Sequence, residues 1–191
     1  MLSAELKYLR TAVLLLSVFT AINFSLRATP LRFKARFHTE EFPEPRFANQ
    51  VLYLQRDPNI NTVVYELNFR NKQLDNDNPI HPFWIRYAEK GQREELSFIQ
   101  RKFAFGITSR PIGNGSYEVH VASYKKYMLY LMKDVKGNYH IYCSINNRQS
   151  ILERIYIHIN GGSFFSPNIL YIELKGINVA TGKEEVQQFK P

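Results

Sequence analysis

The second half of the chain alternates short runs of Val, Ile, Leu and aromatic residues with turn residues, and this pattern constrains the fold most. Runs of β-branched and aromatic residues favour the extended conformation of a strand. Gly and Asn accept the positive φ angles that tight turns between antiparallel strands need. The pattern therefore predicts consecutive strands joined by hairpins. The turn residues are Gly113-Asn-Gly, Lys136-Gly-Asn, Asn146-Asn147, Gly161-Gly162 and Thr181-Gly-Lys.

A further strand is expected from Phe83 to Ala88. Pro79 and Pro82 favour extended geometry in the residues that precede them, so the chain should enter this segment as a strand. Alternation of side chains then separates two faces. One face carries Phe83, Ile85 and Tyr87, and the other carries Trp84 and Arg86.

The stretch from about Gln92 to Ala104 has the clearest helix pattern of the part that follows the apolar N-terminus. Its apolar residues Leu96, Ile99 and Phe103 recur at spacings of three and four, which places them on one face of a helix. Acidic residues fall in its first turn and basic residues in its last turn, as the helix dipole favours. Gly106 follows as a stop signal.

These features, with two strand patterns at residues 50–55 and 62–69, predict a mainly β domain. We expect an antiparallel sandwich or a partly open barrel of about eight or nine strands with one short helix (about 92–104). A helix with one apolar face must bury it against a sheet, so this face and Trp84 should share a core, with Arg86 at its rim. With 191 residues, 45% of them hydrophobic, the chain can bury such a core in one domain, placed at residues 49–191.

Residues 1–28 are typical of an export signal. Lys7 and Arg10 precede an uncharged apolar run at residues 11–24, which is shorter than the roughly 20 residues that cross a bilayer. We interpret the segment as a cleaved secretory signal, with an uncleaved signal anchor or a buried helix as alternatives. The protein is thus expected to be periplasmic or secreted, or tethered to the membrane through this segment alone. Residues 29–48 are expected to be a connector that lies over the domain or trails from it.

The charge of the chain does not single out a nucleic-acid partner. The formal net charge is +8 at pH 7, but the basic residues are scattered and no Lys/Arg-rich run of the kind that contacts a phosphate backbone appears. We therefore expect no nucleic-acid partner.

Residue types that carry metals or catalysis do not form a motif. The chain has one cysteine, Cys143, which lies in an apolar strand pattern and is expected to be a buried, inert thiol. The five histidines lack metal-ligand spacing, and no nucleophile elbow or phosphate-binding glycine loop follows a strand. We expect no metal site, no cofactor and no catalytic residue, and the protein is more consistent with a binding domain than with an enzyme.

Three arginines with apolar or aromatic neighbours are the candidate ligand-binding residues: Arg56, Arg86 and Arg101. A guanidinium group in such surroundings can bind a carboxylate or phosphate with two hydrogen bonds, or stack on a ring. Tyr87 and Gln100, which adjoin two of the arginines, complete the candidate site. The alternative is that these arginines are structural and connect strand ends to loop carbonyls or to glutamates such as Glu66 and Glu89.

Several sequence blocks, spread from about Val51 to the C-terminus, resemble the DUF4833 family. They are Leu54-Gln-Arg, Asn61-Thr-Val-Val-Tyr, Asn78-Pro-Ile, Trp84-Ile-Arg-Tyr, Leu96-Ser-Phe-Ile-Gln-Arg-Lys-Phe-Ala-Phe-Gly and Thr181-Gly-Lys. The resemblance implies an exported or membrane-tethered bacterial protein with a single β-rich domain. It transfers no catalytic residue.

Three classes of function fit these observations. The first is a non-enzymatic domain that binds a small ligand or a partner at the cell envelope, and it requires a mostly apolar pocket or patch. The second is an enzyme of unrecognised type with an arginine-lined cleft, which requires polar side chains from distant segments in one pocket. The third is a structural or assembly component that uses an unpaired strand edge.

Overall fold

The fold was established from a computed structural model, which describes residues 42–163 and 166–191. The expected targeting segment, residues 1–28, lies outside the described residues, as does the first part of the connector. None of the helices within the described ranges is long and apolar enough to cross a membrane.

The end of the expected connector packs on the domain. The Phe42 ring is buried and lies edge-to-face on Tyr156, with ring centroids 5.5 Å apart. The Gln55 amide donates a hydrogen bond from Nε2 to the Pro43 carbonyl at 3.0 Å. The packed part of the chain therefore includes residues from Phe42 onward.

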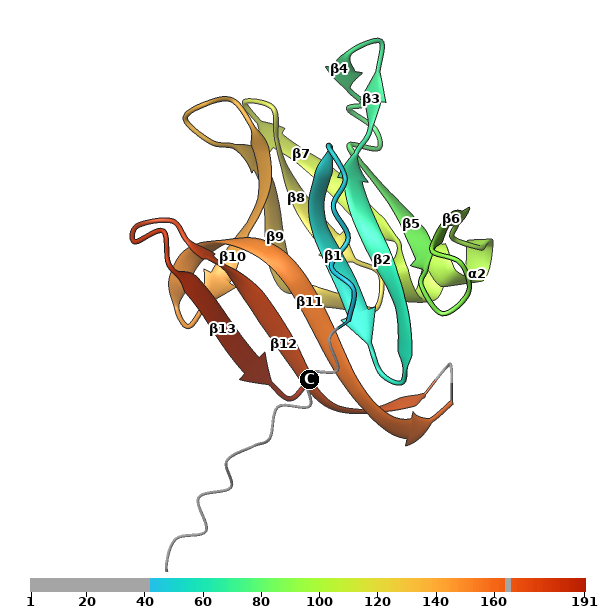
Figure 1. Ribbon diagram of the computed structural model, residues 1–191. Coiled ribbons are helices and arrows are strands. Elements are labelled where there is room, and N and C mark those ends of the chain that lie inside the picture. Colours follow the sequence, from blue (N-terminus) through green and yellow to red (C-terminus); the bar gives the residue numbers. More distant parts are fainter. Residues whose placement is uncertain (1–41, 164–165) are drawn as a thin grey trace, which may run out of the picture. The chain divides into compact units, whose positions relative to one another are not determined.

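The described residues form thirteen strands and one short helical segment between the sixth and seventh strands (Figure 1). The elements are β1 (Gln50–Arg56), β2 (Asn59–Leu67), β3 (Phe69–Arg70), β4 (Gln73–Leu74), β5 (Ile80–Arg86), β6 (Gln92–Glu95), the α-helix α2 (Phe98–Gln100), the π-helix η1 (Arg101–Phe105), β7 (Ile107–Gly113), β8 (Ser116–Val121), β9 (Tyr124–Lys133), β10 (Tyr139–Ile145), β11 (Arg148–Gly162), β12 (Pro167–Asn178) and β13 (Glu184–Phe189).

The mainly β fold is confirmed. Eleven strands form one sheet that is not closed into a barrel, with the order β6-β5-β2-β1-β11-β10-β9-β8-β7, and β12 and β13 extend from β11. The pairings are antiparallel except one, because β1 runs parallel to β11. The count exceeds the expected eight or nine because short pieces such as β3, β4 and β6 are separate strands.

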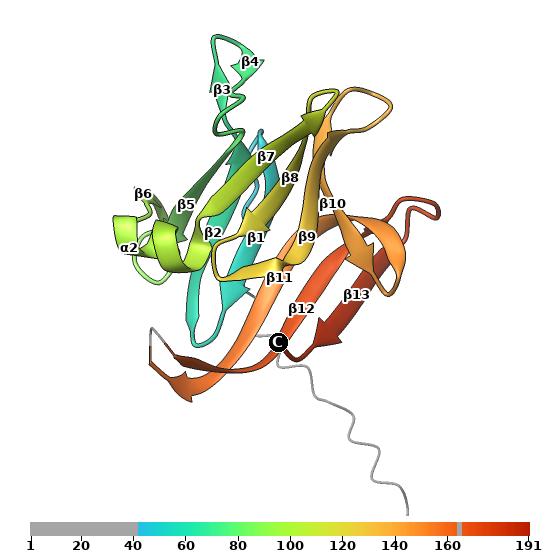
Figure 2. The same cartoon turned by 180° about the vertical axis from the view of Figure 1, so that it is seen from behind.

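The long strand β11 divides the sheet into two layers. Residues 148–151 pair with β10, residues 154–157 pair with β1, and the opposite edge of β11 pairs with β12. The strands β1, β2 and β5 leave β11 on one side of the domain, and β7 to β10 leave it on the other (Figures 1 and 2). The inner faces of both layers contribute to one core, which includes Leu54, Tyr65, Trp84, Leu129 and Ile141.

The two faces expected for the strand at Phe83 are confirmed. Phe83 and Ile85 pack with Val64 in a small cluster on the outer face of β5, and Tyr87 packs against this cluster. Trp84 is buried in the main core on the other face. Cys143 is buried, as expected, and burial raises the pKa of its thiol to about 11, so the thiol stays protonated at neutral pH.

The helical segment is shorter than expected and begins at Phe98 instead of Gln92. Glu94 and Glu95 belong to β6 and pair with β5, so their charges take part in cross-strand ion pairs. Ser97 caps the segment, because its hydroxyl accepts a hydrogen bond from the Gln100 backbone N–H while the Gln100 side chain accepts one from the Ser97 N–H. The change from α to π geometry at Arg101 alters which side chains face the core.

The prediction that Leu96, Ile99 and Phe103 form one buried face is therefore wrong for two of these residues. Leu96 is buried, but Ile99 is 48% exposed and Phe103 is 55% exposed. Phe105 takes their place, and its ring lies edge-to-face on Trp84 with centroids 5.0 Å apart. Helical periodicity could not indicate Phe105, because the π-helix shifts the residues that follow it to another face.

Candidate functional site

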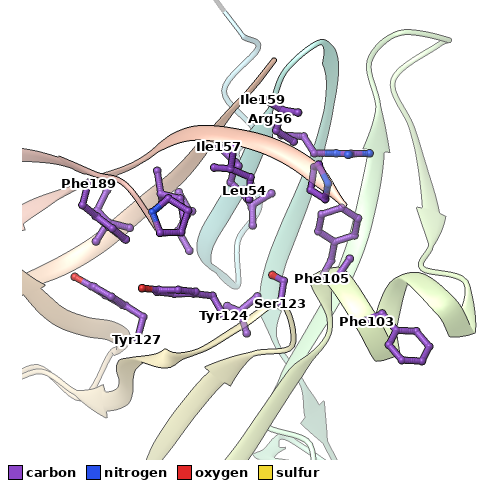
Figure 3. Close-up of a pocket in the computed structure, with 18 of the residues that line it drawn as sticks. Leu54, Arg56, Phe103, Phe105, Ser123, Tyr124, Tyr127, Ile157, Ile159 and Phe189 are labelled. Carbon is purple, nitrogen blue, oxygen red and sulfur yellow. The ribbon is translucent and has the colours of Figure 1, made fainter. Parts of the chain in front are cut away.

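An apolar cavity of about 440 Å³ lies beside the helical segment and is the candidate site (Figure 3). It is lined by 19 residues from β1, η1, β8, β9, β11, β12 and the C-terminal end. Except for Arg56, Ser123 and the hydroxyl groups of two tyrosines, the lining side chains are hydrocarbon. The volume lies within the range of about 300–1,000 Å³ that small-molecule sites occupy.

Alternation along two neighbouring strands builds one wall. Ile155, Ile157 and Ile159 of β11 all line the cavity, as do Leu54 and Arg56 at the end of β1. The parallel pairing of these strands places Arg56 opposite Ile157. The wall is therefore apolar up to the last residue of β1, where it becomes cationic.

The strand β12 extends this wall by means of a β-bulge. Ile169 and Ile172 both line the cavity although an odd number of positions separates them. The register against β11 shifts between His158 and Ile159, where Ile159 pairs with Ile169 and His158 pairs with Tyr171. Leu170 is the extra residue and is exposed.

The helical segment covers one end of the cavity. The Tyr65 hydroxyl, buried in the core, donates a hydrogen bond to the Phe105 carbonyl at 2.9 Å and fixes the end of η1. Gly106 follows, where the carbonyl oxygen of Arg101 approaches so closely that a Cβ atom would lie 1.8 Å from it. Only glycine fits there. The Phe105 ring thus reaches the cavity at a defined position below Arg56 (Figure 3).

Three aromatic residues form the other end. The rings of Tyr127 and Phe189 stack with centroids 5.8 Å apart, and Tyr124 lies beside both. The Tyr127 hydroxyl donates a hydrogen bond to the Ser144 carbonyl at 2.5 Å, and burial raises the pKa of this phenol above its usual value. These hydroxyl groups lie at the end of the cavity away from Arg56 (Figure 3).

Arg56 is the only charged side chain that the described residues contribute to the lining. Its guanidinium group lies 5.3 Å from the centre of the Phe105 ring. Within residues 42–163 and 166–191, its buried Nε has no hydrogen-bond partner and no carboxylate lies within ion-pair distance. Burial lowers the pKa of Arg56 from its ordinary value, which is the direction that loss of solvent produces for a cation. Among the described residues, the side chain is thus a half-buried cation whose buried Nε has no hydrogen-bond partner.

The other arginines named from the sequence lie elsewhere and have partners. Arg86 forms ion pairs with Glu89 at 3.2 Å and Glu94 at 3.1 Å. Arg101 donates a hydrogen bond from Nη2 to the Leu96 carbonyl at 2.9 Å, and Glu95 lies 4.0 Å away. Neither of these two arginines lines the cavity.

The two remaining candidate residues support the scaffold around the cavity. Gln100 accepts hydrogen bonds at Oε1 from the Trp84 indole at 3.3 Å and from the Ser97 N–H at 2.9 Å. Tyr87 packs on the outer face of β5. Of the five residues proposed from the sequence, only Arg56 contributes to the cavity, so the structure does not bring the five together.

A polar cluster on the opposite face of β11 was not expected from the sequence. Asp57 accepts a hydrogen bond from the Tyr156 hydroxyl at 2.7 Å, and the same carboxylate oxygen is hydrogen-bonded to Nδ1 of His158. The His158 ring stacks on Tyr171 with centroids 4.9 Å apart. The two β11 residues alternate with the cavity-lining isoleucines, so this cluster does not contribute to the cavity.

The cavity residues that sequence reasoning missed are mainly Tyr124, Tyr127, Phe105 and Ser123. The alternating isoleucines at 155, 157 and 159 were the available signal, because three of them on one strand face indicate an apolar surface. That signal does not distinguish a filled core from a cavity. Among the described residues, no group of three or more His, Cys, Asp or Glu side chains could hold a metal ion.

Comparison with known proteins supports a family assignment and no more. No curated protein and no solved structure matches the chain. The family described as a domain of unknown function, DUF4833, matches residues 52–188, which include the cavity-lining residues of β1, η1, β11 and β12. Two of the sequence blocks that resemble this family contain Trp84 and Gln100. Contacts of these residues hold the helical segment that covers one end of the cavity. The chain belongs to the DUF4833 family.

Proposed function

We propose that this domain binds an amphipathic small molecule, with an apolar body in the cavity and an anionic head group at Arg56. The observation that carries the proposal is one unpaired guanidinium group at the rim of an otherwise hydrocarbon cavity. A carboxylate or phosphate would accept the hydrogen bonds that Arg56 does not make within the described residues. Fatty acids and related lipids have this combination of groups.

The energetic cost of Arg56 supports a binding role. A polar group buried without a partner costs about 1–3 kcal/mol of stability by protein mutational data. The contact with the Phe105 ring recovers only about 0.5–1 kcal/mol at a partly exposed site. The buried Nε is therefore a net cost to the unliganded protein, and an anionic ligand that accepts its hydrogen bond would remove that cost.

The shape and chemistry of the cavity favour a binding domain over the two other classes. A catalytic cleft requires several polar groups that converge on one reacting atom. Here Arg56 lies at one end of the lining and the tyrosine hydroxyls lie at the other, with only the Ser123 hydroxyl between them (Figure 3). An assembly role through the edge of β13, which pairs only with β12 in the described sheet, would require no cavity at all.

Binding can be tested with the full chain and a dansyl-labelled fatty acid. Trp84 is the only tryptophan and its ring contacts Phe105, so energy transfer from Trp84 to the dansyl group reports occupancy of this cavity. We expect saturable transfer, and displacement by unlabelled hexadecanoate. No transfer with fatty acids, lysophospholipids or acyl phosphates would contradict the proposal.

The variant Arg56→Met separates the contributions of head group and tail. A hydrogen bond to a charged group is worth about 1.5–3 kcal/mol, so affinity for the acid should fall about 10- to 150-fold. Affinity for the methyl ester should change little, because the ester carries no charge.

Arg86→Met is the matched control, since Arg86 has its own carboxylate partners and does not line the cavity. Ile157→Trp should fill the cavity and weaken binding of both compounds.

We further propose that the protein acts outside the cytoplasm, at the cell envelope. The support is the basic N-terminal region followed by the short apolar run at residues 11–24. The single cysteine is consistent with this location, because the domain needs no disulfide to fold.

A further inference from the structure

An exposed apolar patch adjoins the cavity. It consists of Phe98, Ile99 and Phe103, which are 73%, 48% and 55% exposed. Three of the large hydrophobic residues exposed on the described surface therefore fall within six positions of the chain. Soluble domains seldom concentrate such residues without a partner. We call these three residues the apolar patch.

The side chain of Lys102 lies near both aromatic rings of the patch. Its ammonium group lies 5.5 Å from the centre of the Phe98 ring and 5.3 Å from that of Phe103. The aliphatic part of a lysine can lie along an apolar surface while its charge stays in a polar layer. Aromatic rings beside a lysine are typical of segments that lie at the surface of an anionic membrane.

The apolar patch is continuous with the opening of the cavity. The lining residues that are exposed to solvent mark this opening, which we call the mouth: Phe103, Ser123, Pro167 and Pro191. Phe103 thus belongs to both, and its ring points away from the interior (Figure 3). A molecule that leaves a surface in contact with the patch would have a short apolar path into the cavity.

Three lysines adjoin lining residues in the chain. Lys125 and Lys126 lie in the chain between the lining residues Tyr124 and Tyr127, and Lys190 lies between two others. Within the described parts of the chain, no carboxylate comes within ion-pair distance of these three lysines or of Lys102. Of the residues with described positions, no Asp or Glu side chain lines the cavity.

We propose that the apolar patch and the basic residues around the mouth dock the domain onto the anionic surface of a lipid bilayer, from which the cavity takes its ligand. This proposal rests on the proposed function for its second part, while the docking itself stands on the patch. The aromatic rings would enter the layer between head groups and acyl chains, and the lysines would face lipid phosphates. The ammonium group of Lys102 beside the two rings favours an anionic lipid surface as the occupant over an apolar protein surface.

Lipid quenching of a fluorophore at a defined position tests the docking in the full chain, whatever the N-terminal segment does. An environment-sensitive label is attached at Phe98→Cys, or at Val135→Cys as the control. Val135 is fully exposed on the loop between β9 and β10 and does not line the cavity. Cys143 is buried and remains unlabelled in the native protein.

With vesicles that contain phosphatidylglycerol and spin-labelled lipid, we expect quenching and a blue shift at position 98 and neither at position 135. Quenching should be lost on vesicles of phosphatidylcholine alone and at 1 M salt. The double change Lys102→Glu and Lys125→Glu should also abolish it, whereas Lys136→Glu, beside the control position, should have no effect.

The possible results distinguish this proposal from the proposed function. Absence of quenching at position 98, or equal quenching at both positions, overturns docking through the patch. If dansyl fatty acid still binds in that case, the cavity function stands without the membrane surface. If quenching is selective but no fatty acid or lipid enters the cavity, docking stands and the proposed ligand is wrong.

Discussion

Arg56, Arg86 and Arg101 have similar neighbours in the sequence but different environments in the structure. Arg86 meets two glutamates, and Arg101 meets a backbone carbonyl. Arg56 meets the face of an aromatic ring and a hydrocarbon cavity. The difference arises because a guanidinium reaches partners that are distant in the chain, and only the fold decides which partners are near.

Replacing Arg56 by methionine should stabilise the unliganded protein. The change removes the cost of burying an unpaired cation and leaves a flexible apolar side chain in its place. After the lost ring contact is subtracted, the free energy of unfolding should rise by about 1 kcal/mol, which raises Tm by roughly 2–4 °C for a domain of this size. Thermal unfolding followed by circular dichroism measures this.

The matched variant Arg86→Met should shift Tm in the other direction. Surface ion pairs of the kind that Arg86 forms are worth about 0.2–1 kcal/mol each, so this variant should be slightly less stable. A decrease in Tm for Arg56→Met as large as that for Arg86→Met would indicate that Arg56 is structural.

At the scale of elements, the segment from Ser97 to Gly106 depends on Trp84. The indole lies edge-to-face on Phe105 and donates a hydrogen bond to Gln100, so one side chain of β5 contacts both α2 and η1. The segment has no buried residue within α2, and only Phe105 is buried within η1. Its position therefore depends on contacts with the sheet more than on its own helical bonds.

Truncating Trp84 to alanine should destabilise the domain by about 3–5 kcal/mol, the usual range for a buried aromatic residue. Trp84→Phe keeps most of the ring but loses the hydrogen bond to Gln100, so it should cost about 0.5–1.5 kcal/mol for that bond. Urea unfolding of both variants measures the difference. Equal stability of wild type and Trp84→Ala would show that the helical segment is held by other contacts.

At the scale of the whole molecule, the branched pairing of β11 creates the space for the cavity. One edge of β11 pairs first with β10 and then with β1, so the two layers diverge from a common strand and do not close. The helical segment and the C-terminal residues border the space that remains. The cavity is therefore a property of the topology and of no single element.

The location of the protein is also a property of the whole chain, and it can be measured directly. We expect export to remove the basic and apolar N-terminal segment, so that the mature protein begins between about Ser25 and Pro30. Mass spectrometry of the protein purified from its native cell envelope measures this. An intact N-terminus on a protein recovered from the cytosol would contradict export.

The sequence by itself determined the class of the fold and several local features, but not the cavity. Strand periodicity and turn chemistry are local, so the mainly β architecture, the two faces of β5 and the burial of Cys143 followed from residues close together in the chain. The isoleucines of β11 were readable as one apolar face for the same reason.

Only the tertiary structure decided the rest. The parallel pairing of β1 with β11 joins segments about a hundred residues apart, and the bulge at Leu170 and the π-helix at Arg101 shift side chains to faces that simple periodicity does not assign to them. These shifts place Ile169 in the cavity wall and Phe105 beneath Arg56, and they leave the Phe103 ring exposed at the opening. Register and helix geometry depend on long-range packing, which no short window of sequence contains.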